Sequence, residues 1–158
     1  MTAYFDTSAL VAVYVTEAHS RTARRVLRAQ GPIPFTPLHR LELRNAFESL
    51  VGRSLLSSIE RDALSRQVED DRQAGRLAIV ALDWEVVFEK AGDLSALYTR
   101  KYLARSLDLL HVAMAVAIGC RTFVSGDVRQ LKVVRALKLK SINIARSQAH
   151  GEPQRPVR

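Results

Sequence analysis

Short apolar runs alternate with longer stretches of helical periodicity along the whole chain. The runs predict strands at Thr2–Phe5, Ile33–Thr36, Leu77–Leu82, Thr122–Val124 and Ser141–Ile144. The spacing of apolar residues predicts helices at Ser8–Val15, Glu17–Gln30, Leu38–Gly52, Ser57–Gly75, Asp83–Tyr102, Leu107–Ile118 and Asp127–Leu137. Alternating strands and helices are typical of a mostly parallel sheet with helices on both faces. The pattern therefore predicts an α/β fold with three layers and a sheet of four or five strands.

Several helix boundaries carry their own signals. Gly31 and Pro32 stop the second predicted helix. Ser57 and Glu60 have the spacing of a capping box, which predicts a helix that begins there. Ser106 is expected to cap the most apolar helix of the chain.

The length of 158 residues predicts one domain, which we place at residues 1–148. Residues 149–158 are polar and contain two prolines, so we expect a disordered tail there. Cys120 is the only cysteine, which excludes an internal disulfide and fits a reducing compartment. The sequence has no leader pattern and no apolar run of about 18 residues. We therefore expect a cytoplasmic protein that does not enter a membrane.

The formal net charge of +8 changes this picture of an ordinary soluble domain. Such a charge favours a polyanionic partner, which can be nucleic acid, an acidic protein or an anionic membrane surface. A well-solvated surface is the alternative, and charge alone does not decide between them.

Four of the sixteen acidic residues stand in apolar surroundings: Asp6, Glu42, Asp108 and Asp127. Each has an ordinary structural explanation. Asp6 and Asp127 stand at strand-to-helix junctions, where an aspartate commonly caps the helix. Asp108 falls in a first helical turn, where the helix dipole favours a carboxylate. Glu42 is as compatible with a solvent-facing helix as with a site.

Taken together, the four acids predict a metal site. The carboxyl ends of parallel strands meet at one edge of a sheet, so Asp6 and Asp127 should share that edge, and Asp108 could reach it. Carboxylates crowded together need a cation to neutralise them. Oxygen ligands without cysteine suit Mg²⁺, for which Mn²⁺ can substitute.

Other polar residues lie beside these acids in the sequence. Ser8 and Ser125 offer hydroxyls that either cap helices or contact substrate. Arg100 and Arg105 precede the Asp108 helix and are candidates for binding phosphates. His111 follows Asp108 by one helical turn, and we favour a packing role for it over a role as ligand or general acid.

The four motifs resemble those of the PIN-domain ribonucleases, in particular the VapC-type toxins of bacterial toxin–antitoxin pairs. They are "YFDTSALVAVYV" around Asp6, "LELRNAF" around Glu42, "RSLDLLHVAMAVA" around Asp108 and "FVSGD" around Asp127. The resemblance covers nearly the whole chain and all four acidic positions are present. The Ser-Gly-Asp motif is the least specific of the four.

The resemblance implies a PIN-like (Rossmann-like) fold and Mg²⁺-dependent cleavage of RNA by metal-activated water. Asp6 and Asp108 are then expected to hold the metal, and Glu42 and Asp127 to complete the site. A homodimer and a VapB-type antitoxin are the implied partners. The helices predicted at Leu38–Gly52 and Ser57–Gly75 carry spare apolar residues that serve either an antitoxin or the core.

Two other functions compete with this one. The first is a non-catalytic module that binds RNA or protein on the same fold, although a pure binder gains nothing from carboxylates facing phosphates. The second is a phosphoryl-transfer protein of receiver or phosphatase type. That class commonly has adjacent acids or Asp-x-Asp after the first strand, whereas this chain has Asp-Thr-Ser at residues 6–8.

Overall fold

Short parallel strands form the centre of the protein, of which the computed structural model describes residues 3–145. The strands are β1 (Ala3–Phe5), β2 (Ile33–Phe35), β3 (Leu77–Ile79), β4 (Thr122–Ser125) and β5 (Lys140–Asn143). Hydrogen bonds join β1, β4 and β5 in the order β1-β4-β5, while β2 and β3 form a separate pair. Every pairing among these strands is parallel, which confirms the predicted α/β sheet. Its division into three and two strands was not evident from the pattern.

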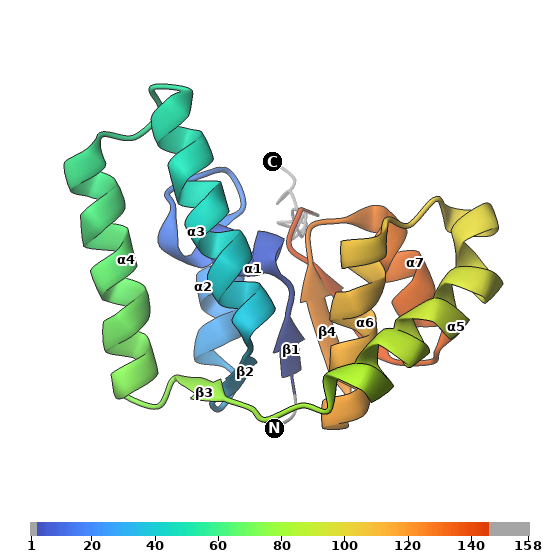
Figure 1. The fold of residues 1–158 in the computed structure, drawn as a ribbon. Helices are drawn as coiled ribbons and strands as arrows, with labels where there is room; N and C mark the ends of the chain where they lie inside the picture. Colours follow the sequence, from blue (N-terminus) through green and yellow to red (C-terminus); the bar gives the residue numbers. More distant parts are fainter. Residues whose placement is uncertain (1–2, 146–158) are drawn as a thin grey trace, which may run out of the picture.

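Helices cover both sides of these strands (Figure 1). They are α1 (Thr7–Tyr14), α2 (Ser20–Arg28), α3 (Pro37–Gly52), α4 (Ser58–Gln73), α5 (Trp84–Tyr102), α6 (Ser106–Ile118) and α7 (Val128–Ala136). In Figure 1, α1 to α4 lie on one side of β1, and α5 to α7 lie on the other. None of the helices within residues 3–145 is long and apolar enough to cross a bilayer.

The two central strands are buried on both faces. Tyr4 and Phe123 belong to the core under α5, α6 and α7, whereas Phe5 and Val124 belong to the core under α1 and α3. This alternation follows from the period of two along a strand. A polar residue placed directly after β1 or β4 is therefore held by a rigid, buried support.

Several boundaries differ from the prediction. The N-cap of α6 is Arg105 rather than Ser106, because the Asp108 carboxylate reaches back to accept a hydrogen bond from the Arg105 N–H at 2.9 Å. Helix α2 begins only at Ser20, after a turn. Strand β3 ends at Ile79, where its pairing with β2 ends. The tail expected at 149–158 lies outside the described residues.

Candidate active site

Asp6 follows the last residue of β1 and is the N-cap of α1. Its Oδ1 accepts a hydrogen bond from the Ala9 N–H at 2.9 Å, as the capping explanation predicted. Its Oδ2 accepts hydrogen bonds from the hydroxyls of Ser8 and Ser125, both at 2.9 Å. Ser125 is the last residue of β4, so both central strands contribute to the environment of this one carboxylate.

The Asp6 carboxylate is almost enclosed, with 5% of the residue exposed. Burial raises its pKa, and the nearby His111 and the hydrogen-bond donors offset only part of that effect. No arginine or lysine of residues 3–145 forms an ion pair with Asp6. The fold therefore holds a buried carboxylate that no arginine or lysine of residues 3–145 neutralises.

Glu42 lies on α3 and points toward α1 and α6. Its Oε2 accepts hydrogen bonds from the Thr7 hydroxyl at 2.5 Å and from the His111 Nε2 at 2.6 Å. Partial burial opposes ionisation of Glu42, but the contacts with His111 and Thr7 outweigh it and lower its pKa. Glu42 is therefore ionised at neutral pH and held from two sides.

Two buried histidines support this part of the site. His111 on α6 contacts the Tyr4 hydroxyl through Nδ1 at 2.7 Å. His39 on α3 donates from Nε2 to the Phe5 carbonyl at 2.8 Å and accepts from the Thr36 N–H at Nδ1. Burial and the neighbouring His111 lower the pKa of His39 to about 3, so this imidazole is neutral. His111 packs against the sheet as favoured, but both of its ring nitrogens have partners.

Asp108 and Asp127 lie at the starts of α6 and α7. Asp127 caps α7 by accepting from the backbone N–H groups of Arg129 and Gln130. Partial burial raises its pKa, but the hydrogen bonds from Arg129 and Gln130 outweigh this and lower it. Arg105 bridges the two acids, with guanidinium nitrogens 3.4 Å from Asp108 Oδ2 and 3.5 Å from Asp127 Oδ2.

The four predicted acids are thus linked along one edge of the sheet. The Ser125 hydroxyl connects Asp6 to the Asp127 N–H, at 2.8 Å from the latter. Arg105 connects Asp127 to Asp108, and Thr7, which follows Asp6, contacts Glu42. Within residues 3–145, however, no three carboxylate, imidazole or thiol groups converge closely enough to hold one ion. A shared metal centre therefore stays a prediction.

The donor set fits a hard divalent cation in its chemistry. It offers carboxylate oxygens with no thiolate, which is the preference of Mg²⁺ and Mn²⁺. The side chains of Asp108, Asp127 and Glu42 are 13%, 19% and 22% exposed, so an ion can reach them. Arg105 neutralises two of these acids, and it would have to move aside for a cation to replace it.

The residues predicted to bind substrate occupy different positions. Ser8 and Ser125 both use their hydroxyls on Asp6, and Ser8 also accepts from the Gly126 N–H at 3.0 Å. Arg105 lies directly at the acids. Arg100 lies exposed in the last turn of α5 and forms no ion pair within residues 3–145. Their roles in substrate binding remain predictions.

Tyr4 and Gln130 were not identified from the sequence. Gln130 is buried and donates from Nε2 to the Asp108 carbonyl at 3.1 Å, which ties α7 to α6. Tyr4 reaches His111 from the middle of β1. A hydroxyl-bearing residue inside an otherwise apolar strand was the available signal for Tyr4, because a buried tyrosine O–H usually finds a partner.

Comparison with known proteins gives a consistent family. The PIN domain family matches residues 3–136. Ribonuclease VapC46 of Mycobacterium tuberculosis is 33% identical over 116 residues, which cover 73% of this chain and 75% of the relative.

Solved structures share the fold at low sequence identity. The M. tuberculosis toxin VapC20, described as cleaving the sarcin–ricin loop, has a TM-score of 0.65 at 14% identity and covers 90% of this chain and 99% of its own. DNA-bound VapBC from Salmonella typhimurium has a TM-score of 0.62 at 16% identity, with 91% and 98% covered. The family match over most of the chain and the 33% identity to the M. tuberculosis ribonuclease are decisive: the chain belongs to the PIN-domain family.

Proposed function

We propose that this PIN-domain protein is a metal-dependent endoribonuclease that acts in the cytoplasm as the toxin of a toxin–antitoxin pair. The observation that carries the proposal is the chain of four acids, Asp6, Glu42, Asp108 and Asp127, along the edge where β1 and β4 end. The names of the relatives, a ribonuclease and a toxin that cleaves an RNA loop, support the same chemistry.

Asp6 and Asp108 would hold a divalent cation, with Glu42 and Asp127 completing the site. A bound Mg²⁺ or Mn²⁺ would supply Lewis-acid activation of water and charge stabilisation on the scissile phosphate. The contribution of the protein is to hold carboxylate oxygens in place, through the hydroxyls of Thr7, Ser8 and Ser125. No nucleophilic side chain is needed for hydrolysis of this kind.

Arg105 is the residue best placed to meet the RNA backbone. Its side chain is 68% exposed and lies at the acids. When a cation takes over the neutralisation of Asp108 and Asp127, the guanidinium is released beside the site, where it can bind a phosphate in a bidentate manner. The net charge of +8 supplies the longer-range attraction for RNA.

The proposal is tested by incubating the purified protein with RNA and Mg²⁺ or Mn²⁺, with EDTA as control. We expect cleavage that EDTA abolishes and that Asp6→Asn removes while the protein stays folded. Metal-independent cleavage, or full activity of Asp6→Asn, would overturn the assignment. Salt-dependent RNA binding without cleavage would favour the non-catalytic module.

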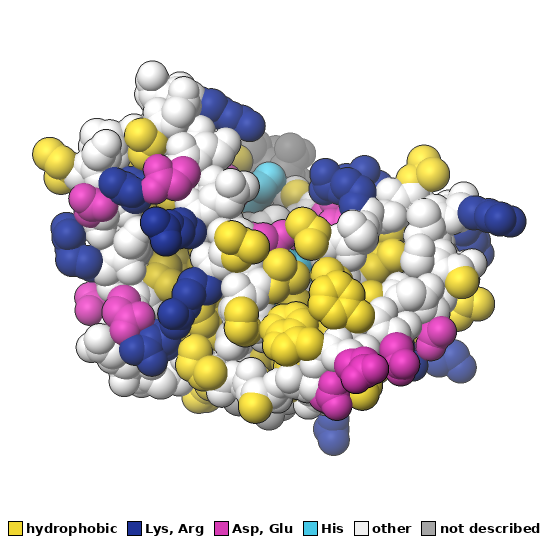
Figure 2. Space-filling view, viewed as in Figure 1, with side chains coloured by type: hydrophobic (Ala, Val, Ile, Leu, Met, Phe, Trp, Pro, Cys, Tyr) yellow, Lys and Arg dark blue, Asp and Glu magenta, His cyan; other side chains and the backbone are white. Residues whose placement is uncertain are grey.

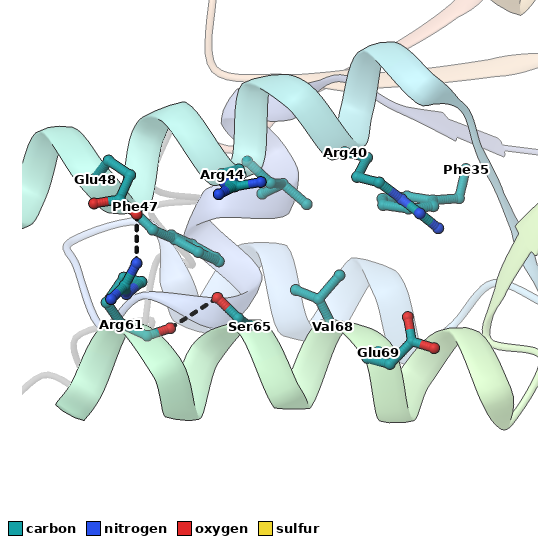
Figure 3. A pocket seen from close by; sticks show the side chains of 10 residues that line it. Phe35, Arg40, Arg44, Phe47, Glu48, Arg61, Ser65, Val68 and Glu69 are labelled. Carbon is teal, nitrogen blue, oxygen red and sulfur yellow. Dashed lines mark hydrogen bonds and ion pairs between the residues drawn. The ribbon is translucent and has the colours of Figure 1, made fainter. Parts of the chain in front are cut away.

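A groove between α3 and α4 suits the antitoxin (Figure 3). This pocket of about 330 Å³ is lined by apolar side chains, including Phe47 and Val68, and by charged residues. Arg40 and Arg44 line it as well and form no ion pair within residues 3–145. Apolar walls with two unpaired arginines fit a peptide that combines an aromatic or aliphatic anchor with acidic side chains. We assign this groove to a segment of the VapB-type antitoxin.

Charge reversal in the groove tests that assignment. Arg44→Glu should weaken binding of the small protein encoded beside this chain by at least about tenfold, because like charges then face each other. Arg66→Glu, on an exposed position of α4 outside the pocket, is the matched control. Equal affinity of both variants would place the antitoxin elsewhere.

The homodimer would use an apolar face over α3, β3 and the start of α5. Leu41, Ile79 and Phe88 are 65%, 57% and 58% exposed there, and Figure 2 shows the hydrophobic side chains as a continuous central area. Acidic residues of α5 form a row at the lower right of Figure 2, at one border of this area. A two-fold axis through the apolar face would bury it between the two copies.

Phe88→Glu should convert the dimer into a monomer in light scattering, whereas Leu55→Glu should not. Leu55 is equally exposed, at 65%, but lies in the connection between α3 and α4. A monomeric wild-type protein at micromolar concentration would refute this interface.

A further inference from the structure

The Glu42 carboxylate has two hydrogen-bond partners, and one of them, His111, is buried in the core. Thr7 and His111 both contact Oε2, at 2.5 and 2.6 Å. The opposite nitrogen of His111 contacts the Tyr4 hydroxyl at 2.7 Å. Tyr4 and His111 are 0% and 3% exposed, so solvent does not compete for these contacts.

Chemistry fixes the direction of the hydrogen bond between His111 and Glu42. Burial, together with the charges of Asp6 and Glu42, raises the pKa of Tyr4, so the phenol keeps its proton. An ionised Glu42 can only accept hydrogen bonds. The Nε2–H of His111 therefore donates to Glu42, and its Nδ1 pairs with the Tyr4 hydroxyl, which also lies 3.9 Å from Met114 Sδ. A proton on Nδ1 alone would leave Glu42 without its hydrogen bond from His111.

The same contacts give the Glu42 carboxylate an orientation. Oε2 carries the hydrogen bonds from Thr7 and His111, while Oε1 accepts none from residues 3–145. The Glu42 side chain is 22% exposed, so solvent can reach it. One oxygen is thus committed to the protein and the other is left for a ligand.

We propose that Tyr4 and His111 form a positioning relay that fixes Glu42, with Oε2 held by the protein and Oε1 presented to the reacting groups. Neither residue touches substrate, so both act through Glu42. The proposal rests on the proposed function, because it assigns Glu42 to the hydrolytic site. It differs from plain packing in one respect: packing requires the rings, whereas the relay requires the Tyr4 O–H and the Nε2–H of His111.

Two tyrosine variants separate the hydroxyl from the ring. Tyr4→Phe keeps the ring that stacks on Phe123 and removes the hydroxyl that contacts His111 and, more weakly, Met114 Sδ. Tyr14→Phe is the matched control, because Tyr14 is also buried and donates to Asp71 at 2.8 Å, away from Glu42. Loss of a partner behind a ligand commonly lowers metal affinity or activity by about 10- to 100-fold. We expect Tyr4→Phe to weaken Mn²⁺ binding in calorimetry by about tenfold, with a similar fall in kcat and an unchanged KM for RNA. Tyr14→Phe should change none of the three.

Two variants of His111 provide a rescue test. The amide nitrogen of His111→Gln can lie near the position of Nε2 and donate to Glu42, whereas His111→Met fills the space without a donor. We expect Mn²⁺ affinity in the order wild type, His111→Gln, His111→Met. Equal affinity of the two variants would reduce His111 to a packing residue.

The tautomer gives a readout that needs neither metal nor activity. In the metal-free protein, ¹⁵N NMR of the imidazoles should show a proton on Nε2 of His111, and Tyr4→Phe should shift its Nδ1 resonance. A proton on Nδ1 of neutral His111, or identical Mn²⁺ affinities of Tyr4→Phe and Tyr14→Phe, would overturn the relay while leaving the proposed nuclease intact. Wild-type protein that binds no Mn²⁺ and cleaves no RNA would overturn both.

Discussion

The four acids at the edge of the sheet form two pairs that differ in the residues that contact them. The inner pair, Asp6 and Glu42, is held by hydroxyls, a backbone amide and an imidazole, and no arginine contacts it within residues 3–145. The outer pair, Asp108 and Asp127, is neutralised by Arg105, and Asp127 also by Arg129. The inner partners Ser125 and His111 are buried, whereas Arg105 is mostly exposed.

This difference separates carboxylates with a fixed orientation from carboxylates whose arginine partner can be displaced. Buried partners cannot leave without disrupting the core, so the inner carboxylates keep their orientation whether or not a cation is bound. An exposed arginine at 3.4–3.5 Å contributes little to stability and can be displaced. We infer that the inner pair is preformed, while the outer pair exchanges an arginine for a cation.

Replacing Asp6 should have the largest effect and should act in opposite directions on activity and stability. We expect Asp6→Asn to reduce RNA cleavage at least about 1,000-fold, or roughly 4 kcal/mol of transition-state stabilisation. Burial raises the pKa of Asp6, so its charge destabilises the metal-free fold, and removing the charge should raise the melting temperature by about 2–4 °C. Calorimetry of the metal-free protein measures this shift.

Asp108→Asn is the matched change in the outer pair. It should also reduce cleavage, but it should not raise the melting temperature, because Arg105 already compensates the Asp108 charge. A lower melting temperature for Asp6→Asn than for wild type would contradict the contrast between the two pairs.

The sequence predicted the positions of the acids at the strand ends better than the contacts that surround them. Asp6 and Asp127 were predictable because strand ends and helix caps are local features that a parallel sheet brings together. The cap of α6 was assigned to Ser106 because residue type favoured serine, but the Asp108 side chain satisfies the N–H of Arg105 instead. The contact between Tyr4 and His111 spans 107 residues and depends on the rotamers of both side chains, which no local pattern encodes.

Acidification should lower the free energy of unfolding, because the fold buries His39 in its neutral form. Burial has the largest effect on the pKa of His39 and, together with the neighbouring His111, lowers it to about 3. In the unfolded chain a histidine titrates near its ordinary value of 6.5. Between these values the unfolded chain binds a proton that the folded chain does not, so stability rises with pH and falls on acidification. The slope approaches 1.4 kcal/mol per pH unit, or about 2 kcal/mol between pH 6.5 and 5.

His39→Gln isolates this contribution from that of the carboxylates. We expect urea unfolding of the variant to show a shallower loss of stability over the same pH range. Parallel profiles for wild type and His39→Gln would mean that His39 is protonated in the fold, which its contacts with the Phe5 carbonyl and the Thr36 N–H do not permit.

Removing Arg105 should have the smallest effect and tests the exchange in the outer pair directly. Arg105→Ala leaves Asp108 without its arginine, and Asp127 with Arg129 alone. Because exposed ion pairs contribute at most about 1 kcal/mol, Mn²⁺ should bind the metal-free variant up to about fivefold more tightly. The KM for RNA should rise at the same time, because the guanidinium that would bind phosphate is gone.

Arg100→Ala, which removes an arginine without a carboxylate partner in residues 3–145, should leave Mn²⁺ affinity unchanged. Weaker Mn²⁺ binding by Arg105→Ala would show that the arginine organises the two acids for the cation rather than competing with it, and the outer pair would then be as preformed as the inner one.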